Sequence, residues 1–182
     1  MSKVSFIEIK YNERFISGEL LEIKRHLKFF KKNNISFYFP FKNKALKKEE
    51  IAKQINKDRD CNCPIDVARK INNFFKKKEK QIMDYLRRYD RNLKFKKKYN
   101  TYLNYYGCDG YYYPPNKIVV NIHNKSLNYI IETIVHELIH LLIYKSYKNN
   151  NYMATEKRVD EIFIKSGLIE LFPHYKTQQF KK

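Results

Sequence analysis

The spacing of apolar residues along the chain predicts five helices and four strands. Apolar positions recur at helical spacing in residues 18–32, 47–57, 64–89, 129–143 and 156–166. Residues 3–10 and 35–41 alternate between apolar and polar side chains as strands do, and residues 111–122 predict a β-hairpin with its turn at 114–116. Pro64 suits the first turn of the third helix, and the polar stretch 58–64 is predicted to be a linker.

This succession of helices and strands is typical of an α+β protein with two regions. Residues 1–60 are expected to form a basic, mostly helical N-terminal region whose function the sequence does not indicate. Residues 64–182 are expected to form a domain in which the apolar helix 129–143 packs on a short β-sheet. The chain has no run of eighteen apolar residues and no secretory signal pattern, so we predict a cytoplasmic protein without a transmembrane segment.

The middle of the most apolar helix contains the sequence His136-Glu137-Leu138-Ile139-His140. Two histidines four residues apart share one face of a helix and can bind one Zn²⁺, while the glutamate between them can accept a proton from a water molecule. With this composition, chance would produce about 0.01 such motifs in the chain. The alternative is a core helix with hydrogen-bonded histidines, but burying such groups unpaired costs roughly 2 kcal/mol or more each. We therefore predict a metal site with Glu137 as general base.

A catalytic zinc usually has three protein ligands and a water, so another residue must complete this site. Glu156 and Asp160 are four residues apart in a predicted helix whose apolar positions are Val159, Ile162 and Phe163. This spacing suits a glutamate ligand followed by a carboxylate that holds the free ring nitrogen of a zinc-bound histidine. Alternatively, Glu156 forms an ion pair on a solvated face, and Asp160 or Glu161 is the ligand.

Residues 136–140 (HELIH) and 156–160 (EKRVD) resemble the HExxH and ExxxD motifs of gluzincin metallopeptidases, including the compact minigluzincins. Residues 156–163 also resemble the second motif helix of ImmA/IrrE-type zinc peptidases. The resemblance covers residues from about 107 to 172 and implies a small zincin-like domain whose edge strand pairs with extended substrate. It further implies that His136, His140 and Glu156 bind one zinc ion, that Glu137 is catalytic and that Asp160 orients a ligand.

The activity implied by this resemblance is zinc-dependent hydrolysis of peptide bonds in an intracellular protein. SprT-like proteases share the helix but use a histidine as third ligand, and His174 is the one histidine downstream of the motif. A further donor normally stabilises the oxyanion in such enzymes. Tyr175, His174, Tyr152 and His123 are candidates, although each is more commonly an ordinary surface or core residue.

The three cysteines do not form a disulfide framework, because their number is odd and two of them are two residues apart. Cys61-Asn62-Cys63 could bind a metal but lacks the second pair that structural zinc sites use. Cys108 could cap the zinc ion in a latent form of the enzyme. Both ideas are weaker than the reading of the chain as an intracellular protein with free thiols.

The formal net charge of +19 favours contact with nucleic acid or acidic proteins through a lysine-rich surface. Aromatic residues lie among the lysines and could stack on bases: Phe74, Phe75, Tyr85, Tyr89, Phe95, Tyr99, Tyr102, Tyr105 and Tyr106. The alternative is that the lysines, asparagines and tyrosines reflect an AT-biased genome. The second functional hypothesis is therefore a basic nucleic-acid-binding or regulatory protein whose zinc site is structural or vestigial.

Overall fold

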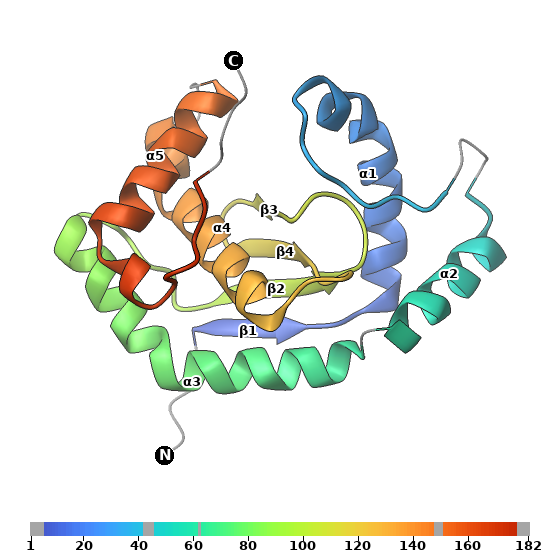
Figure 1. Cartoon of the computed structure of the whole chain (residues 1–182), viewed down its shortest axis with the longest axis horizontal. Coiled ribbons are helices and arrows are strands. Elements are labelled where there is room, and N and C mark those ends of the chain that lie inside the picture. Colours follow the sequence, from blue (N-terminus) through green and yellow to red (C-terminus); the bar gives the residue numbers. More distant parts are fainter. Residues whose placement is uncertain (1–5, 42–45, 62, 148–150, 178–182) are drawn as a thin grey trace.

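The computed structural model describes residues 6–41, 46–61, 63–147 and 151–177, which form five α-helices and a four-stranded mixed sheet (Figure 1). The strands are β1 (Ile7–Lys10), β2 (Tyr99–Asn104), β3 (Gly110–Tyr113) and β4 (Lys117–Asn121). The helices are α1 (Glu13–Lys32), α2 (Lys48–Cys61), α3 (Pro64–Tyr89), α4 (Leu127–Tyr147) and α5 (Tyr152–Lys165), followed by the 3-10 turn Leu168–Glu170. The predicted α+β class is confirmed.

The strands follow the order β1-β2-β4-β3 across the sheet. Both β1 and β4 pair parallel with β2, whereas β3 pairs antiparallel with β4 and forms one edge. The register places Ile7 opposite Tyr99 and Gly110 opposite Val120. The sheet therefore extends across the boundary predicted at residues 60–64, because β1 precedes that boundary and the other three strands follow it.

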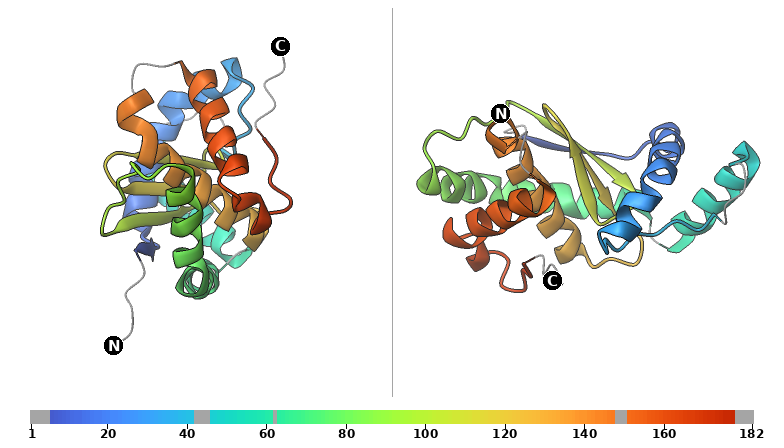
Figure 2. Two further views of the ribbon diagram at one scale, coloured as in Figure 1. Left: turned by 90° about the vertical axis from the view of Figure 1, so that its left-hand side faces the viewer. Right: turned by 90° about the horizontal axis from the view of Figure 1, so that it is seen from above.

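Helices cover both faces of the sheet, and Figure 2 (right) shows α1 on one side with α4 and α5 on the other. On the α1 side, Phe15 stacks on Tyr102 with ring centroids 4.1 Å apart. The buried carboxylate of Glu19 accepts hydrogen bonds from Tyr111 and Tyr113 of β3, at 2.8 and 3.0 Å. Because side chains alternate along a strand, Gly110 and Tyr112 of β3 face the opposite side, toward α4.

The longest helix, α3, has the bounds that the sequence predicts. Pro64 stands at its first turn, and the buried residues Ile71, Phe75, Ile82 and Leu86 follow at intervals of four, seven and four. These side chains belong to the same hydrophobic cluster as β1, α4 and α5. Figure 1 shows α3 running along β1 at the lower margin of the molecule, below α4 and α5.

Asparagine side chains fix the start of two helices. Asn12 accepts a hydrogen bond from the Phe15 amide at 3.1 Å, and Asn151 accepts one from the Ala154 amide at 2.8 Å. Each bond satisfies an amide that has no partner within its own helix. The cap at Asn12 explains why α1 begins at Glu13, five residues before the start predicted from its apolar stripe.

Three sequence-based predictions about the elements were wrong. Residues 35–41 form no strand, because this extended segment bridges the rest of the chain at Tyr38 and Gly107 alone among the described residues. Residues 58–61 of the predicted linker 58–64 are helical, since α2 continues to Cys61, and Pro64 already belongs to α3. Strand β2 was not predicted. Tyr99 in this strand and Tyr105 and Tyr106 just after it are buried, so these three rings belong to the core and cannot stack on bases.

One described helix, Leu127–Ser146 within α4, is long and apolar enough to cross a membrane by length and composition. In this structure 61% of the most apolar 18-residue window of that stretch is buried inside the protein. Its apolar residues pack against β3, β4 and α5, which accounts for its composition without a membrane. The helix is therefore the central core helix of the fold.

Candidate metal centre

Helix α4 carries the motif His136-Glu137-Leu138-Ile139-His140 at its centre. The short connection from β4 starts α4 beside the sheet, and the helix then lies against β3 and β4. Leu138 and Ile139 are fully buried in the core, whereas His136, Glu137 and His140 are 7%, 7% and 3% exposed. The three polar side chains thus face a nearly dry space between α4 and its neighbours.

Helix α5 brings Glu156 to this space. Val159, Ile162 and Phe163 are buried at 0%, 1% and 0% exposure, and they hold α5 against the core as the sequence predicts. Glu156 lies on the same inward face and is 4% exposed. The alternative of an ion pair on a solvated face is therefore wrong for Glu156.

The side chains of His136, His140 and Glu156 converge on one point. His136 Nε2 is 3.1 Å from Glu156 Oε2, and His140 Nε2 is 3.2 Å from Glu156 Oε1. The two Nε2 atoms are 3.2 Å apart. Within the described ranges, these three residues are the one group of histidine, cysteine and carboxylate side chains whose ligand atoms are close enough together to hold a metal ion.

These distances suit a small divalent cation. In a tetrahedral zinc site, with ligand atoms about 2.0–2.1 Å from the metal, neighbouring ligand atoms lie about 3.3–3.4 Å apart. The observed separations of 3.1–3.2 Å are close to that value. Two imidazoles and a carboxylate are also donors that zinc and related transition metals accept. The residues present therefore fit a bound metal ion.

The charge of Glu156 supports the same interpretation. Burial alone would raise the pKa of this carboxyl group, but hydrogen bonds with His136 and His140 lower it to about 2. Burial would likewise lower the pKa of His136, and the carboxylates of Glu156 and Glu137 raise it. Glu156 therefore stays ionised and requires a positive charge beside it, which either a metal ion or a histidine proton supplies.

A chain of hydrogen bonds orients the ring of His136. Its Nδ1 is 3.0 Å from the hydroxyl of Tyr175, and that hydroxyl donates to the Asp160 carboxylate. Because the tyrosine proton goes to Asp160, the tyrosine oxygen accepts the proton on His136 Nδ1. His136 Nε2 is then left with a free lone pair directed at Glu156 and His140, as metal coordination requires.

The surroundings of His140 come from β3. Tyr112 stacks on the imidazole with ring centroids 4.9 Å apart and an angle of 15° between the planes. The Nδ1 atom of His140 is buried and has no hydrogen-bond partner within the described part of the chain. Packing against Tyr112, rather than a hydrogen bond at Nδ1, therefore limits the rotation of this ring.

The side chain of Glu137 lies between the backbone of α4 and Gly110, the first residue of β3. A Cβ atom at position 110 would come 2.8 Å from Glu137 Oε1 and 2.6 Å from Thr133 Cγ2, so Gly110 is the residue that allows β3 to approach α4 this closely. Burial raises the pKa of the Glu137 carboxyl group, and the two histidines oppose that shift. Glu137 is thus held next to the group of potential ligands and the edge strand.

Most of the other residues considered from the sequence lie away from this point. Glu161 is half-buried and pairs with Arg158 and Lys165, and His174 is exposed, so neither joins the group. His123 stacks on Tyr38 at 3.7 Å. Cys108 donates to the carbonyl of Gly110 and is not among the converging ligands, whereas the side chain of Cys61 and residue 62 lie outside the described residues.

Two residues near the site were missed or misjudged from the sequence. Tyr175 was named as a candidate oxyanion donor, but its hydroxyl is engaged by His136 and Asp160. The contact of Tyr112 with His140 was not predicted. No local signal points to either role, because Tyr175 is 39 residues from His136 and Tyr112 is 28 residues from His140.

Comparison with known proteins adds nothing to this geometry, because no family model, no curated protein and no solved structure matches the chain.

Proposed function

We propose that this protein is a zinc-dependent metallopeptidase. The observation that carries the proposal is the convergence of His136, His140 and Glu156 within 3.1–3.2 Å, with the buried carboxylate of Glu137 beside them. A structural zinc site usually has four protein ligands, whereas a catalytic site has three and leaves a position for water or substrate. Three ligands and an adjacent carboxylate match the catalytic type, as in the gluzincins that the sequence resembles.

In this proposal each residue has a distinct task. His136, His140 and Glu156 hold the zinc ion, which when bound polarises the substrate carbonyl and lowers the pKa of a water molecule. Glu137 accepts the proton of the attacking water and returns it to the amine that leaves. Tyr175 and Asp160 keep His136 in the tautomer that binds metal.

The edge strand β3 offers a place for the peptide substrate. It pairs with β4 on one side, and Gly110 brings its first residue next to Glu137. An extended peptide added to the free side of β3 would gain backbone hydrogen bonds and pass the metal site. Tyr112 of this strand stacks on His140, so its side chain is expected to line the approach to the zinc ion.

Metal content tests the proposed ligands. We expect about one zinc per chain in the wild-type protein purified without added metal, measured by plasma mass spectrometry, and clear loss in Glu156→Ala. Glu161→Ala is the matched control, because it removes the same group from a half-buried position of α5 outside the metal centre. A wild-type protein that takes up no zinc even after incubation with the metal would contradict the proposal.

Cleavage separates a peptidase from a protein with a structural or vestigial zinc site. Glu137→Gln should keep its zinc and lose metal-dependent cleavage of an unfolded protein such as reduced casein, followed by mass spectrometry. If the wild type binds zinc and cleaves no member of a broad peptide library, or if Glu137→Gln cleaves as fast as the wild type, the catalytic assignment is wrong and the structural alternative holds.

A further inference from the structure

The outer face of α3 carries a row of cations that the metal site does not use. Between Pro64 and Lys98 the chain has thirteen lysines and arginines and four acidic residues. Four basic residues of α3 and Arg91 just after it are exposed, and the half-buried Asp84 lies among them. We call this row the α3 basic stripe: Lys77, Lys80, Asp84, Arg87, Arg88 and Arg91.

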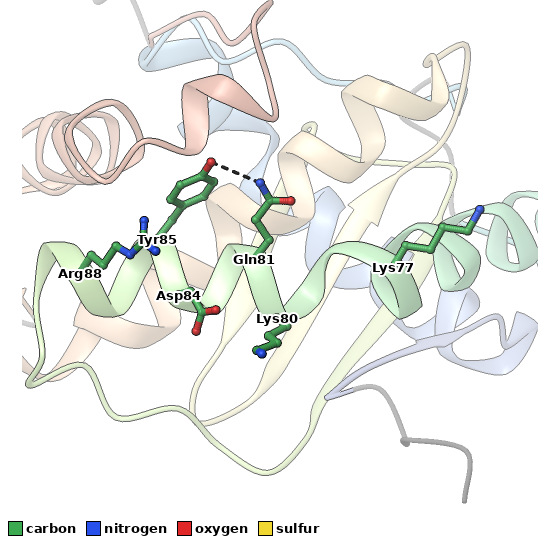
Figure 3. A pocket seen from close by; sticks show the side chains of 6 residues that line it. All are labelled: Lys77, Lys80, Gln81, Asp84, Tyr85 and Arg88. Atoms are coloured by element: carbon green, nitrogen blue, oxygen red, sulfur yellow. Dashed lines mark hydrogen bonds between the residues drawn. The ribbon is translucent and has the colours of Figure 1, made fainter.

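Helical geometry places the stripe opposite the core. At 100° per residue, its members within α3 (Lys77 to Arg88) fall in an arc about 100° wide on the side away from the buried Ile82. Two open hollows of about 460 and 340 Å³ lie between these long side chains, and Figure 3 shows the residues of the second hollow on successive turns of α3. The stripe therefore forms one continuous surface rather than scattered charges.

The charges of the stripe are not neutralised within the protein. None of its five basic residues forms an ion pair with another described residue, in contrast to Arg69 with Asp66 and Lys98 with Glu8. Arg87 lies over the ring of Phe95, 5.0 Å from its centroid, which leaves its outer edge available. The stripe is thus a surface of unpaired cations exposed to solvent.

We propose that the α3 basic stripe binds the phosphate backbone of nucleic acid, independently of base sequence. From Lys77 to Arg88 the helix rises about 17 Å, a length over which one strand of a duplex presents about five phosphates. Three of the five cations are arginines, whose forked guanidinium groups bind phosphate oxygens in pairs. The number, spacing and type of the cations therefore match a nucleic-acid strand.

The composition of the stripe argues against two other polyanionic partners. An interfacial helix on an anionic membrane inserts apolar side chains, and a stable protein interface is organised around buried aromatic or aliphatic anchors. The exposed large hydrophobic residues of the described chain are Leu21, Phe29, Ile65, Tyr113, Tyr129, Met153 and Ile164, and none lies in the stripe. Recognition there depends on charge, which suits a phosphate backbone.

Fluorescence anisotropy with a labelled 20-base-pair duplex DNA of arbitrary sequence tests the proposal. For five phosphate contacts, the logarithm of the association constant should fall with the logarithm of the salt concentration with a slope of about −4.5. The triple variant Lys80→Gln, Arg87→Gln, Arg91→Gln should bind at least tenfold more weakly at 100 mM salt, with a slope reduced in magnitude by about 2.7. These positions are exposed, so the variant should keep its circular dichroism spectrum.

A matched variant separates the stripe from the charge of the whole protein. Lys28→Gln, Lys31→Gln, Lys32→Gln removes the same charge from exposed positions of α1, and it should bind like the wild type. Equal weakening of both triple variants would overturn the proposal, since attraction would then follow net charge alone. Competition by polyglutamate or anionic vesicles as effective as that of unlabelled DNA would also overturn it. Glu156→Ala should bind DNA normally, because the metal site takes no part.

Discussion

Removing the hydroxyl of Tyr175 is expected to weaken zinc binding without removing a zinc ligand. This hydroxyl is 3.0 Å from His136 Nδ1 and donates to Asp160, whose carboxylate is 7% exposed. In Tyr175→Phe the His136 imidazole and the Asp160 carboxylate both lose this hydrogen-bond partner. The tautomer of His136 with its proton on Nδ1 is then no longer favoured. Loss of such an outer contact typically costs about 10–100-fold in metal affinity, which corresponds to roughly 1.4–2.7 kcal/mol.

The substitution changes little else. The ring of Tyr175 stacks on Phe163 with centroids 3.7 Å apart and planes 5° from parallel, and phenylalanine preserves that contact. Zinc affinity is measured by competition with a chromogenic chelator, and circular dichroism checks the fold. Tyr85→Phe is the matched control, because its hydroxyl bonds with Glu170 and Gln81 on the surface. A zinc affinity of folded Tyr175→Phe within twofold of wild type would refute the orienting role.

Three further outcomes follow from the structure. Gly110→Ala should lower the free energy of unfolding in urea by about 1–3 kcal/mol, since its Cβ would overlap neighbouring atoms, and it should reduce cleavage by displacing Glu137. Unchanged stability and cleavage would show that β3 can move away from α4. Burial raises the pKa of the Cys108 thiol to about 12, so this thiol stays protonated at pH 8. Iodoacetamide should therefore modify the exposed Cys63 far sooner than Cys108, as measured by peptide mass spectrometry, and equal rates of modification would contradict this. Phe75→Ala, at a fully buried site, should cost about 3–5 kcal/mol in the same unfolding assay, and a loss below 1 kcal/mol would mean that the cavity collapses.

The sequence predicted those parts of the fold that local spacing determines. The bounds of α3 follow from Pro64 and from apolar residues at helical intervals, and the hairpin of β3 and β4 follows from its turn residues. The pairing of His136 with His140 is likewise fixed by one helical turn. Glu156 was predicted because it precedes Asp160 by four residues, although its contact with the histidines arises from packing between two helices.

Contacts between distant segments explain the errors. The alternation of Ile35, Phe37 and Phe39 resembles a strand, but these side chains pack on the core from an extended segment. Strand β2 has a mixture of tyrosine and asparagine that suggested an exposed aromatic surface. Its burial results from parallel pairing on both sides, with β1 far upstream and β4 downstream, which no local pattern reports.

The parallel pairing of β1 with β2 has a consequence for how the chain folds during synthesis. Ile7 pairs with Tyr99, so about 90 residues separate two neighbours in the sheet, including all of α1, α2 and α3. At about 5–20 residues per second, a ribosome takes roughly 5–18 s to add the residues between them. During that time β1 leaves the exit tunnel without its partner, and the residues of α1, α2 and α3 are synthesised before the sheet can close. Cells in which translation slows within this interval should therefore show more aggregation or degradation of the nascent chain.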